Sequence, residues 1–189
     1  EKIPEINYSN IFLNNFHFLD KAKNHDCNYF FANNLIEKIK QSNGQELASH
    51  TFSHLYTLEK GVVENDFLTD IDQMFMLFNN HNINLSSIVF PRNQYSNFIL
   101  DLCRKKSIKS FRGNQTNYLF RPSLNQNFLK RFLRLIDNYI NLSGFNPSIA
   151  KFNNGILEIP ASRFLRPYNK RLSFLEKLRL NRIKSEMTF

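Results

Sequence analysis

Gly44-Gln45-Glu46-Leu47-Ala48-Ser49-His50-Thr51-Phe52-Ser53-His54, residues 44–54, is the stretch that bears most directly on the fold of this chain. Its part from 45 to 49 has the character of a short strand, and that strand runs directly into His50. If a helix begins just after the strand, His50 and His54 lie one turn apart on the same helix face. The stretch therefore predicts a strand-to-helix junction that carries two imidazoles.

The segments on either side alternate between helical and strand patterns. Short apolar runs predict strands over 87–90, 107–111 and 155–159. Apolar residues recur at helical spacing over 8–22, 34–41, 65–79, 95–105 and 126–141, and a basic helix follows from 172. This alternation predicts an α/β fold with a parallel sheet and covering helices, either open or closed into a barrel. We expect all 189 residues, 1–189, to form a single domain.

Two of the predicted helices have strongly apolar faces, which we interpret as core. The helix over 65–79 places Phe67, Ile71, Met74, Phe75 and Phe78 on one side. The helix over 126–141 is expected to turn its own apolar face inward, with Phe128, Phe132, Leu135, Ile136 and Tyr139. We interpret these phenylalanines as packing residues and not as an aromatic platform for sugars.

Polar side chains follow each predicted strand. The strand ends deliver His50, then Arg92 with Asn93, then Arg112, and finally Ser162 with Arg163. Parallel strands place functional groups at their C-terminal ends, so these residues are expected to converge on one rim of the sheet.

Composition excludes some classes of protein. A content of 42% hydrophobic residues is too high for a disordered chain, and no run reaches the ~18 apolar residues of a membrane-spanning helix. Cys27 and Cys103 lie far apart and form neither a disulfide framework nor a cysteine-type zinc site. The start, Glu1-Lys2-Ile3-Pro4-Glu5, has no initiator Met and no signal-peptide core, so we expect the chain to be cut from a longer one.

The formal charge of +9 lies mostly from Arg104 onward. A basic surface attracts nucleic acid, acidic glycan or anionic lipid, and a merely solvated basic face is the common alternative. Arg104, Lys105, Lys106, Lys109 and the C-terminal cations are the candidates for binding a polyanion. No recognition-helix or base-stacking signature indicates a specific nucleic acid.

His50 and His54 are candidate ligands of a divalent metal. Neutral imidazole suits zinc, iron, nickel or cobalt, and both rings reach one cation if they share a helix face. The alternative is that two of five histidines share a face by chance. The hydroxyl groups of Ser49, Thr51 and Ser53 are expected to orient the ring nitrogens that do not bind metal.

The run 45–54 resembles the second motif, H-[ST]-x-x-H, of the polysaccharide deacetylase family, the carbohydrate esterases that act on chitin and peptidoglycan. Val89-Phe90-Pro91-Arg92-Asn93 is similar to the family's third motif, and the resemblance extends over roughly residues 28–165. It implies a deformed (β/α) barrel and a divalent metal, usually zinc, held by two His and one Asp. It also implies hydrolysis of an N-acetyl or O-acetyl group on a glycan.

The resemblance also implies roles for single residues. His50 and His54 would bind the metal, Thr51 and Ser53 would support them, and Arg92 would orient the catalytic base. From their place at the rim of the predicted sheet, Asn93, Arg112 and Arg163 are candidates to contact the acetylated glycan, and ordinary surface or ion-pair roles are the alternative for Arg112 and Arg163. The family's first and last motifs are absent, so the base, the acid and one ligand are missing from this chain, and Pro91 precedes Arg92 instead of following it.

Several alternatives stay open at the level of sequence. Asp66 and Asp70 could replace the missing ligand, or cap or line the solvent face of the helix they begin. Glu158, near a strand end, is ambiguous in the same way. The chain could also be a basic interaction module or an inactive member of the family. The oligomeric state and the compartment, bacterial cytoplasm or cell envelope, also stay open.

Overall fold

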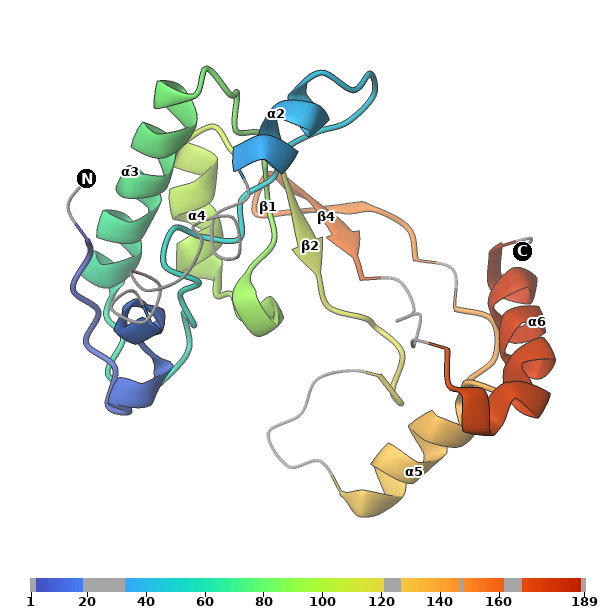
Figure 1. Cartoon of the computed structure of the whole chain (residues 1–189). Coiled ribbons are helices and arrows are strands. Elements are labelled where there is room, and N and C mark those ends of the chain that lie inside the picture. Colours follow the sequence, from blue (N-terminus) through green and yellow to red (C-terminus); the bar gives the residue numbers. More distant parts are fainter. Residues whose placement is uncertain (1–2, 19–32, 121–126, 147, 162–167, 188–189) are drawn as a thin grey trace. The chain divides into compact units, whose positions relative to one another are not determined.

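The computed structural model describes residues 3–18, 33–120, 127–146, 148–161 and 168–187 (Figure 1). The chain divides into two compact units. Unit 1 comprises Glu1–Arg112 and Phe152–Glu158, and unit 2 comprises Gly113–Lys151 and Ile159–Phe189. The single domain over 1–189 stays a prediction.

Four strands form one sheet with the order β1-β2-β4-β3. Their bounds are β1 Ser87–Ile88, β2 Ser110–Gly113, β3 Lys151–Asn153 and β4 Ile156–Pro160. Strands β1 and β2 are parallel, with Ser87 opposite Ser110. Ser49 adds a parallel bridge to Ile88 on the other side of β1.

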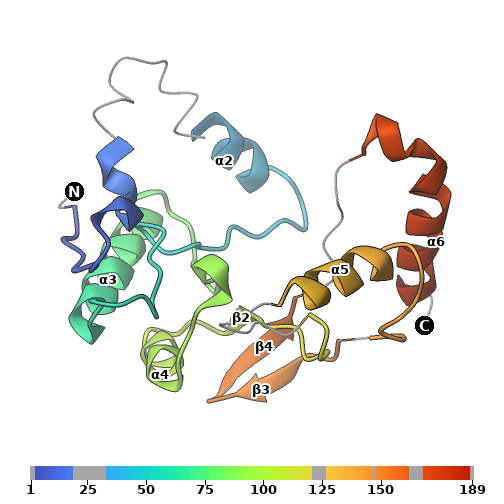
Figure 2. The same ribbon diagram turned by 90° about the horizontal axis from the view of Figure 1, so that it is seen from below.

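Strand β4 also runs parallel to β2. The amide of Leu157 donates to the carbonyl of Lys109 at 2.9 Å, and the amide of Ala161 donates to that of Gly113 at 3.0 Å, with the same sequence offset. Strands β3 and β4 form a hairpin (Figure 2) whose turn, Asn154-Gly155, has φ of 50° and 78°. Such turns favour Asn-Gly because both residues adopt positive φ. Within the described residues the sheet is open, and the barrel stays a prediction.

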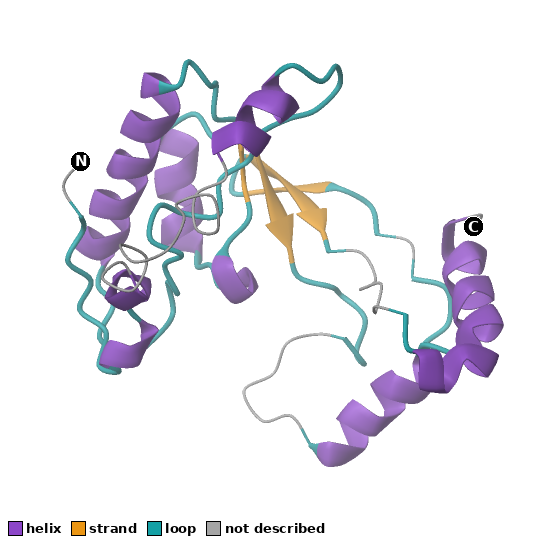
Figure 3. Cartoon of the chain, in the orientation of Figure 1, coloured by secondary structure: helices purple, strands orange, loops and turns teal. Residues whose placement is uncertain are grey.

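The helices are five α-helices and four short 3-10 turns among the described residues (Figure 3). The α-helices are α2 Asn33–Lys40, α3 Glu64–Asn80, α4 Asn97–Lys105, α5 Phe128–Asp137 and α6 Glu176–Met187, and the turns are η1 Ile11–Leu13, η2 Asn15–Phe18, η4 Pro91–Asn93 and η5 Lys170–Leu175. In the part of the chain that the structure describes, no helix has the length and hydrophobicity that crossing a bilayer requires.

The predicted α-helix over 8–22 is wrong for its described part, where the chain forms η1 and η2. The side chain of Asn10 accepts from the amide of Phe12 at 3.1 Å, and that of Asn14 accepts from the amide of Phe16 at 3.0 Å. Side chains that capture backbone amides in this way compete with α-helical hydrogen bonds. Residues 19–22 lie outside the described residues.

The core of unit 1 lies between α3, α4 and the sheet. The buried residues Phe67, Ile71 and Met74 of α3 confirm the predicted apolar face of this helix, and Phe75 and Phe78 pack against the same core partly buried. Helix α3 begins at Glu64, and Asp66 in its first turn accepts a 2.9 Å hydrogen bond from the amide of Val63, so Asp66 takes part in the cap but is buried and does not lie on the solvent face.

Cys103 is part of this core. Burial raises the pKa of its thiol to about 12, so the thiolate is not accessible near neutral pH. Cys27 lies outside the described residues.

The predicted inward face of α5 is wrong. Phe128 is 84% exposed and Phe132 is 49% exposed, and the only fully buried side chain of α5 is Asp137. Periodicity identifies an apolar arc, but it does not tell what the arc packs against. Unit 2 has little core to offer, because Leu119 and Ala161 are its only buried hydrophobic residues among those described.

Candidate metal centre

The segment that carries His50 and His54 is an irregular loop between α2 and α3 (Figure 3). The predicted strand over 45–49 is reduced to the single bridge of Ser49, and the predicted helix after it is absent. Thr51 and His54 have φ of 63° and 59°, in the left-handed region that an α-helix excludes. The two rings nevertheless lie side by side, with centres 4.7 Å apart and planes at 66°.

Asp70 of α3, expected to cap the helix or line its solvent face, is instead fully buried and holds this loop in place. Its carboxylate accepts from the amide of Phe52 at 2.8 Å, from the amide of Ser53 at 2.9 Å and from the hydroxyl of Ser53. Burial raises the pKa of Asp70, and these hydrogen bonds oppose the rise. Both carboxylate oxygens are occupied within the loop, so Asp70 supports the histidines as part of the scaffold.

The hydroxyl groups of Thr51 and Ser53 also bind within the loop. Thr51 Oγ1 accepts from the amide of Leu55 at 2.7 Å, and Ser53 donates to Asp70. We expected these hydroxyls to orient the imidazoles directly. In the described residues they fix the backbone that carries the imidazoles.

His50 is oriented by a backbone carbonyl. Its Nδ1 lies 2.6 Å from the carbonyl oxygen of Val89, which follows β1. A carbonyl oxygen only accepts, so in the neutral ring this Nδ1 carries the proton and Nε2 keeps its lone pair. That is the arrangement in which metal-binding histidines are commonly held, with one nitrogen donating to a carbonyl or carboxylate.

The surroundings of His54 lower the pKa of its ring and so favour the neutral form. Burial is the largest cause, and the neighbouring His50 and Arg92 lower the pKa further. Its Nδ1 is buried and has no hydrogen-bond partner among the described residues. A neutral imidazole with an unsatisfied buried nitrogen suits a cation ligand.

The separation of the two rings fits one shared cation. Two imidazoles that bind a single zinc at ~2.1 Å have ring centres roughly 5 Å apart. The observed 4.7 Å agrees with this distance. Within the described residues, no cluster of three or more His, Cys, Asp or Glu side chains accompanies the pair.

Tyr56, Glu59 and Arg92 surround the pair. The Tyr56 ring meets His54 edge-on, with centres 5.1 Å apart, and the Arg92 guanidinium lies 4.1 Å from the centre of the Tyr56 ring. Arg92 Nη1 donates to Glu59 Oε1 at 2.9 Å, and Gln94 Nε2 donates to the same oxygen at 3.2 Å. Tyr56 and Glu59 were missed by the sequence analysis, because neither belongs to a motif and neither ends a strand.

Backbone strain is concentrated around these residues. Arg92 and Asn93 have φ of 53° and 52°, as Thr51 and His54 do on the other loop. These four are more than half of the non-glycine residues with positive φ in the described part of the chain: Thr51, His54, Asn82, Arg92, Asn93, Ser107 and Asn154. Such conformations cost roughly 1–3 kcal/mol each and cluster at functional sites.

The other predicted site residues are less closely associated with the pair. Asn93 is half-buried in η4, beside Arg92. Arg112, expected just after a strand, lies within β2 and is exposed. Arg163 lies outside the described residues. Glu158 is buried and accepts from Tyr95 at 3.3 Å and from Asn153 at 3.0 Å.

An open cavity of about 320 Å³ adjoins His50. His50, Ser49 and Thr51 line one part, and the rest is mostly apolar, formed by Asn33, Ile36, Leu47, Ala48, Leu77, Phe78, His81 and Ile83. Its volume is within the range of small-molecule sites.

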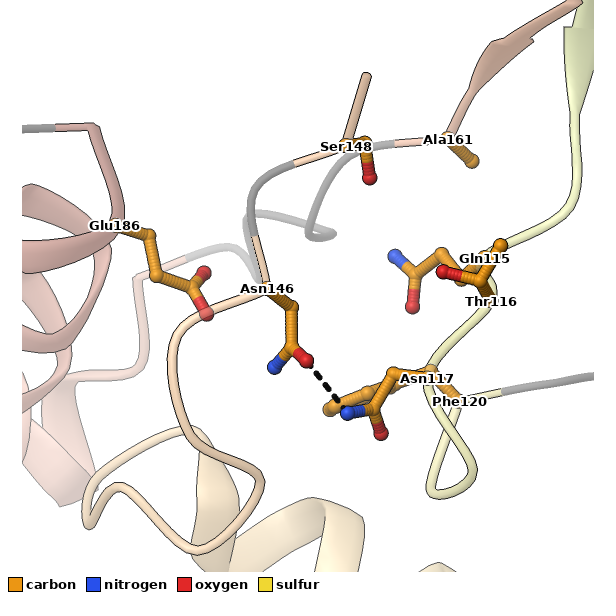
Figure 4. A pocket seen from close by; sticks show the side chains of 8 residues that line it. All are labelled: Gln115, Thr116, Asn117, Phe120, Asn146, Ser148, Ala161 and Glu186. Atoms are coloured by element: carbon orange, nitrogen blue, oxygen red, sulfur yellow. Dashed lines mark hydrogen bonds between the residues drawn. The ribbon is translucent and has the colours of Figure 1, made fainter. Parts of the chain in front are cut away.

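A second cavity, in unit 2, is much smaller and more polar. Its volume is about 40 Å³, and two of the residues that line it are hydrogen-bonded, with Asn117 Nδ2 donating to Asn146 Oδ1 at 2.6 Å (Figure 4). The size suits one or two water molecules. None of the predicted site residues lines it.

Comparison of the chain with protein-family models, curated proteins and solved structures finds no match.

Proposed function

We propose that this chain contributes two imidazole ligands to the divalent-metal centre of a hydrolase that removes acetyl groups from a glycan. The observation that carries the proposal is the His50–His54 pair, with ring centres 4.7 Å apart and with Nδ1 of His50 bonded to the Val89 carbonyl. This bond leaves Nε2 of His50 free to bind a cation. The resemblance of residues 45–54 and 89–93 to deacetylase motifs supplies the reaction class.

The two rings are the residues that would hold the metal, with zinc as the expected ion. A bound zinc ion supplies Lewis acidity toward the acyl carbonyl and lowers the pKa of a bound water. The chain's own contribution is positional. Asp70 fixes the loop, the Val89 carbonyl orients the ring of His50, and burial lowers the pKa of His54, which favours its neutral form.

The remaining metal ligand, the base and the acid would come from outside the described residues. Glu59 is paired with Arg92 and Asp70 with the loop, so neither carboxylate replaces them. The cavity beside His50 offers apolar space for a non-polar part of the substrate. The sugar and its linkage follow from the resemblance only as a class, an acetylated polysaccharide or glycolipid.

Cobalt titration monitored by visible absorption tests the ligand role. Replacing His50 or His54 by Gln should weaken cobalt binding by at least the 10–100-fold that loss of an outer-sphere partner costs. His81→Gln is the matched control, because His81 lines the same cavity and is exposed. Equal affinities for all three variants and the parent chain would reject the metal centre. Metal binding without release of acetate from N-acetylated oligosaccharides would identify an inactive relative.

Binding of a polyanion through Arg104, Lys105, Lys106 and Lys109 has weaker support. Lys106 is paired with Asp72, and Arg104 lies 3.7 Å from Asp101, so part of this cluster is already neutralised locally. A steep fall of nucleic-acid or acidic-glycan affinity with salt would favour this alternative.

A further inference from the structure

The two units differ sharply in charge. Unit 2 contains 13 Lys or Arg against 3 Asp or Glu, whereas unit 1 contains 12 against 13. The formal charge is therefore +10 for unit 2 and −1 for unit 1. The whole positive excess of the chain belongs to unit 2, a field that attracts anionic partners.

Helix α5 of unit 2 divides cleanly into an apolar arc and a basic arc. At 100° per residue, the apolar side chains cover one side of the helix, Phe128, Leu129, Phe132, Leu133, Leu135 and Ile136. The opposite side carries Lys130, Arg131 and Arg134. Much of the apolar arc faces solvent, since Phe128 is 84% and Leu129 is 65% exposed.

The position of α5 is fixed from its C-terminal end by a buried polar anchor. Asp137 accepts from the amides of Leu142 and Ser143 at 2.9 and 2.6 Å, and its carboxylate lies 3.8 Å from Arg182 of α6. Arg182 also donates to the carbonyl of Gly144 at 2.8 Å. The anchor uses the one fully buried side chain of α5 and leaves the apolar arc exposed.

We propose that the exposed apolar arc of α5 docks unit 2 onto the surface of an anionic lipid bilayer. An amphipathic helix with Phe and Leu on one side and Lys and Arg on the other is suited to lying in the bilayer interface. The phenylalanines enter the boundary between headgroups and acyl chains, while the exposed cations of unit 2, such as Arg131, meet anionic headgroups.

Charge and hydrophobicity together favour this occupant over two others. A second copy of the chain would bring its own positive unit 2 to the face, and like charges repel. A nucleic acid would satisfy the cations through its phosphates, but it would leave the Phe128 and Leu129 side chains without an apolar partner. A bilayer of anionic lipids offers acyl chains to the apolar arc and negative headgroups to the basic arc.

Vesicle co-sedimentation of the 189-residue chain tests the proposal. The probes are vesicles of phosphatidylcholine alone and vesicles with 30% phosphatidylglycerol, and binding to the second should be the stronger. Phe128→Ser should lower the partition coefficient about tenfold, from lost apolar burial. Arg131→Gln should lower it about fivefold, because each cation near the surface contributes to this extent.

Phe12→Ser is the matched control, since Phe12 is 86% exposed and belongs to unit 1. It should bind as the parent chain does. No binding to either vesicle, or equal losses for Phe12→Ser and Phe128→Ser, would overturn the proposal. A parent chain that dimerises without lipid, and a Phe128→Ser variant that stays monomeric, would assign the face to a second copy. Binding of RNA that Arg131→Gln weakens and Phe128→Ser leaves unchanged, without lipid binding, would assign it to nucleic acid.

Discussion

Units 1 and 2 use their hydrophobic residues in opposite ways. Of the 16 buried hydrophobic residues among those described, 14 belong to unit 1 and 2 to unit 2. Of the 25 exposed large hydrophobic residues, 15 belong to unit 2, although fewer of its residues are described. Unit 1 is therefore held by apolar packing and unit 2 by polar anchors. The amphipathic pattern of a helix does not by itself tell whether apolar packing or polar anchors will hold that helix in place.

The largest expected difference between the units is in the cost of truncating a phenylalanine. Phe111 of unit 1 is 1% exposed, and Phe111→Ala should lower the free energy of unfolding by about 4 kcal/mol. Phe128→Ala in unit 2 should change it by less than ~0.5 kcal/mol, because the side chain is already in water. Urea denaturation followed by circular dichroism measures both. Similar losses for the two variants would remove the contrast between the units.

The polar anchor of unit 2 should give the next largest effect. Asp137→Ala removes the acceptor of the Leu142 and Ser143 amides and one of the two carboxylates beside the buried Arg182, the other being Glu186, and should cost about 2 kcal/mol. The pair Asp137→Ala with Arg182→Met should recover part of this loss, since the buried guanidinium that faced Asp137 is then also absent. Thermal denaturation of the single and double variants gives the coupling. Additive losses would mean that the two side chains do not depend on each other.

Asp70 offers the corresponding test of a polar anchor inside unit 1. Asp70→Ala removes the acceptor of the Phe52 and Ser53 amides and should cost about 2 kcal/mol. Because the loop carries His50 and His54, cobalt affinity should fall by roughly 10–100-fold as well. Asp72→Ala, on the exposed side of the same helix, is the control. A stability loss with unchanged cobalt affinity would separate Asp70 from the metal centre.

The smallest expected effect concerns pH. The folded chain raises the pKa of Asp70 above its ordinary value of 3.8, so it binds this proton more tightly than the unfolded chain does. The contribution of Asp70 to stability is therefore greatest below pH 3.8, and it falls as pH rises through the higher folded pKa. The difference in unfolding free energy between the parent chain and Asp70→Asn should follow this direction between pH 3.5 and 7. A difference that grows with pH would contradict it.

The sheet could be anticipated from the sequence because its strands are short apolar runs between helices. The strands predicted over 87–90, 107–111 and 155–159 correspond to β1, β2 and β4, each displaced or shortened by a few residues. The spacing of these strands along the chain indicated parallel pairing, because parallel strands need long connections. Whether the sheet closes into a barrel stays a prediction.

The loop of His50 and His54 could not be predicted from local sequence. Thr51 is β-branched and rarely adopts positive φ, and the enrichment of His at positive φ is too weak to mark His54, so the sequence does not reveal the left-handed backbone that replaces the expected helix. The backbone is fixed by Asp70, at the end of a contact that spans 17 residues. The arc of α5 was identified correctly and its burial was not, because burial depends on partners elsewhere in the fold.

The hydrogen bond from the His50 ring to the Val89 carbonyl forms only if the segment that ends at Ser49 is correctly aligned with β1. The Val89 amide donates to the carbonyl of Ser49 at 2.8 Å, and the Val89 carbonyl accepts from Nδ1 of His50, the residue that follows Ser49. Inserting one residue between Ser49 and His50 would turn the ring to the opposite side of the sheet. Cobalt colour would then report whether this edge of the sheet has assembled in the correct register, since an unfolded chain does not hold both rings together.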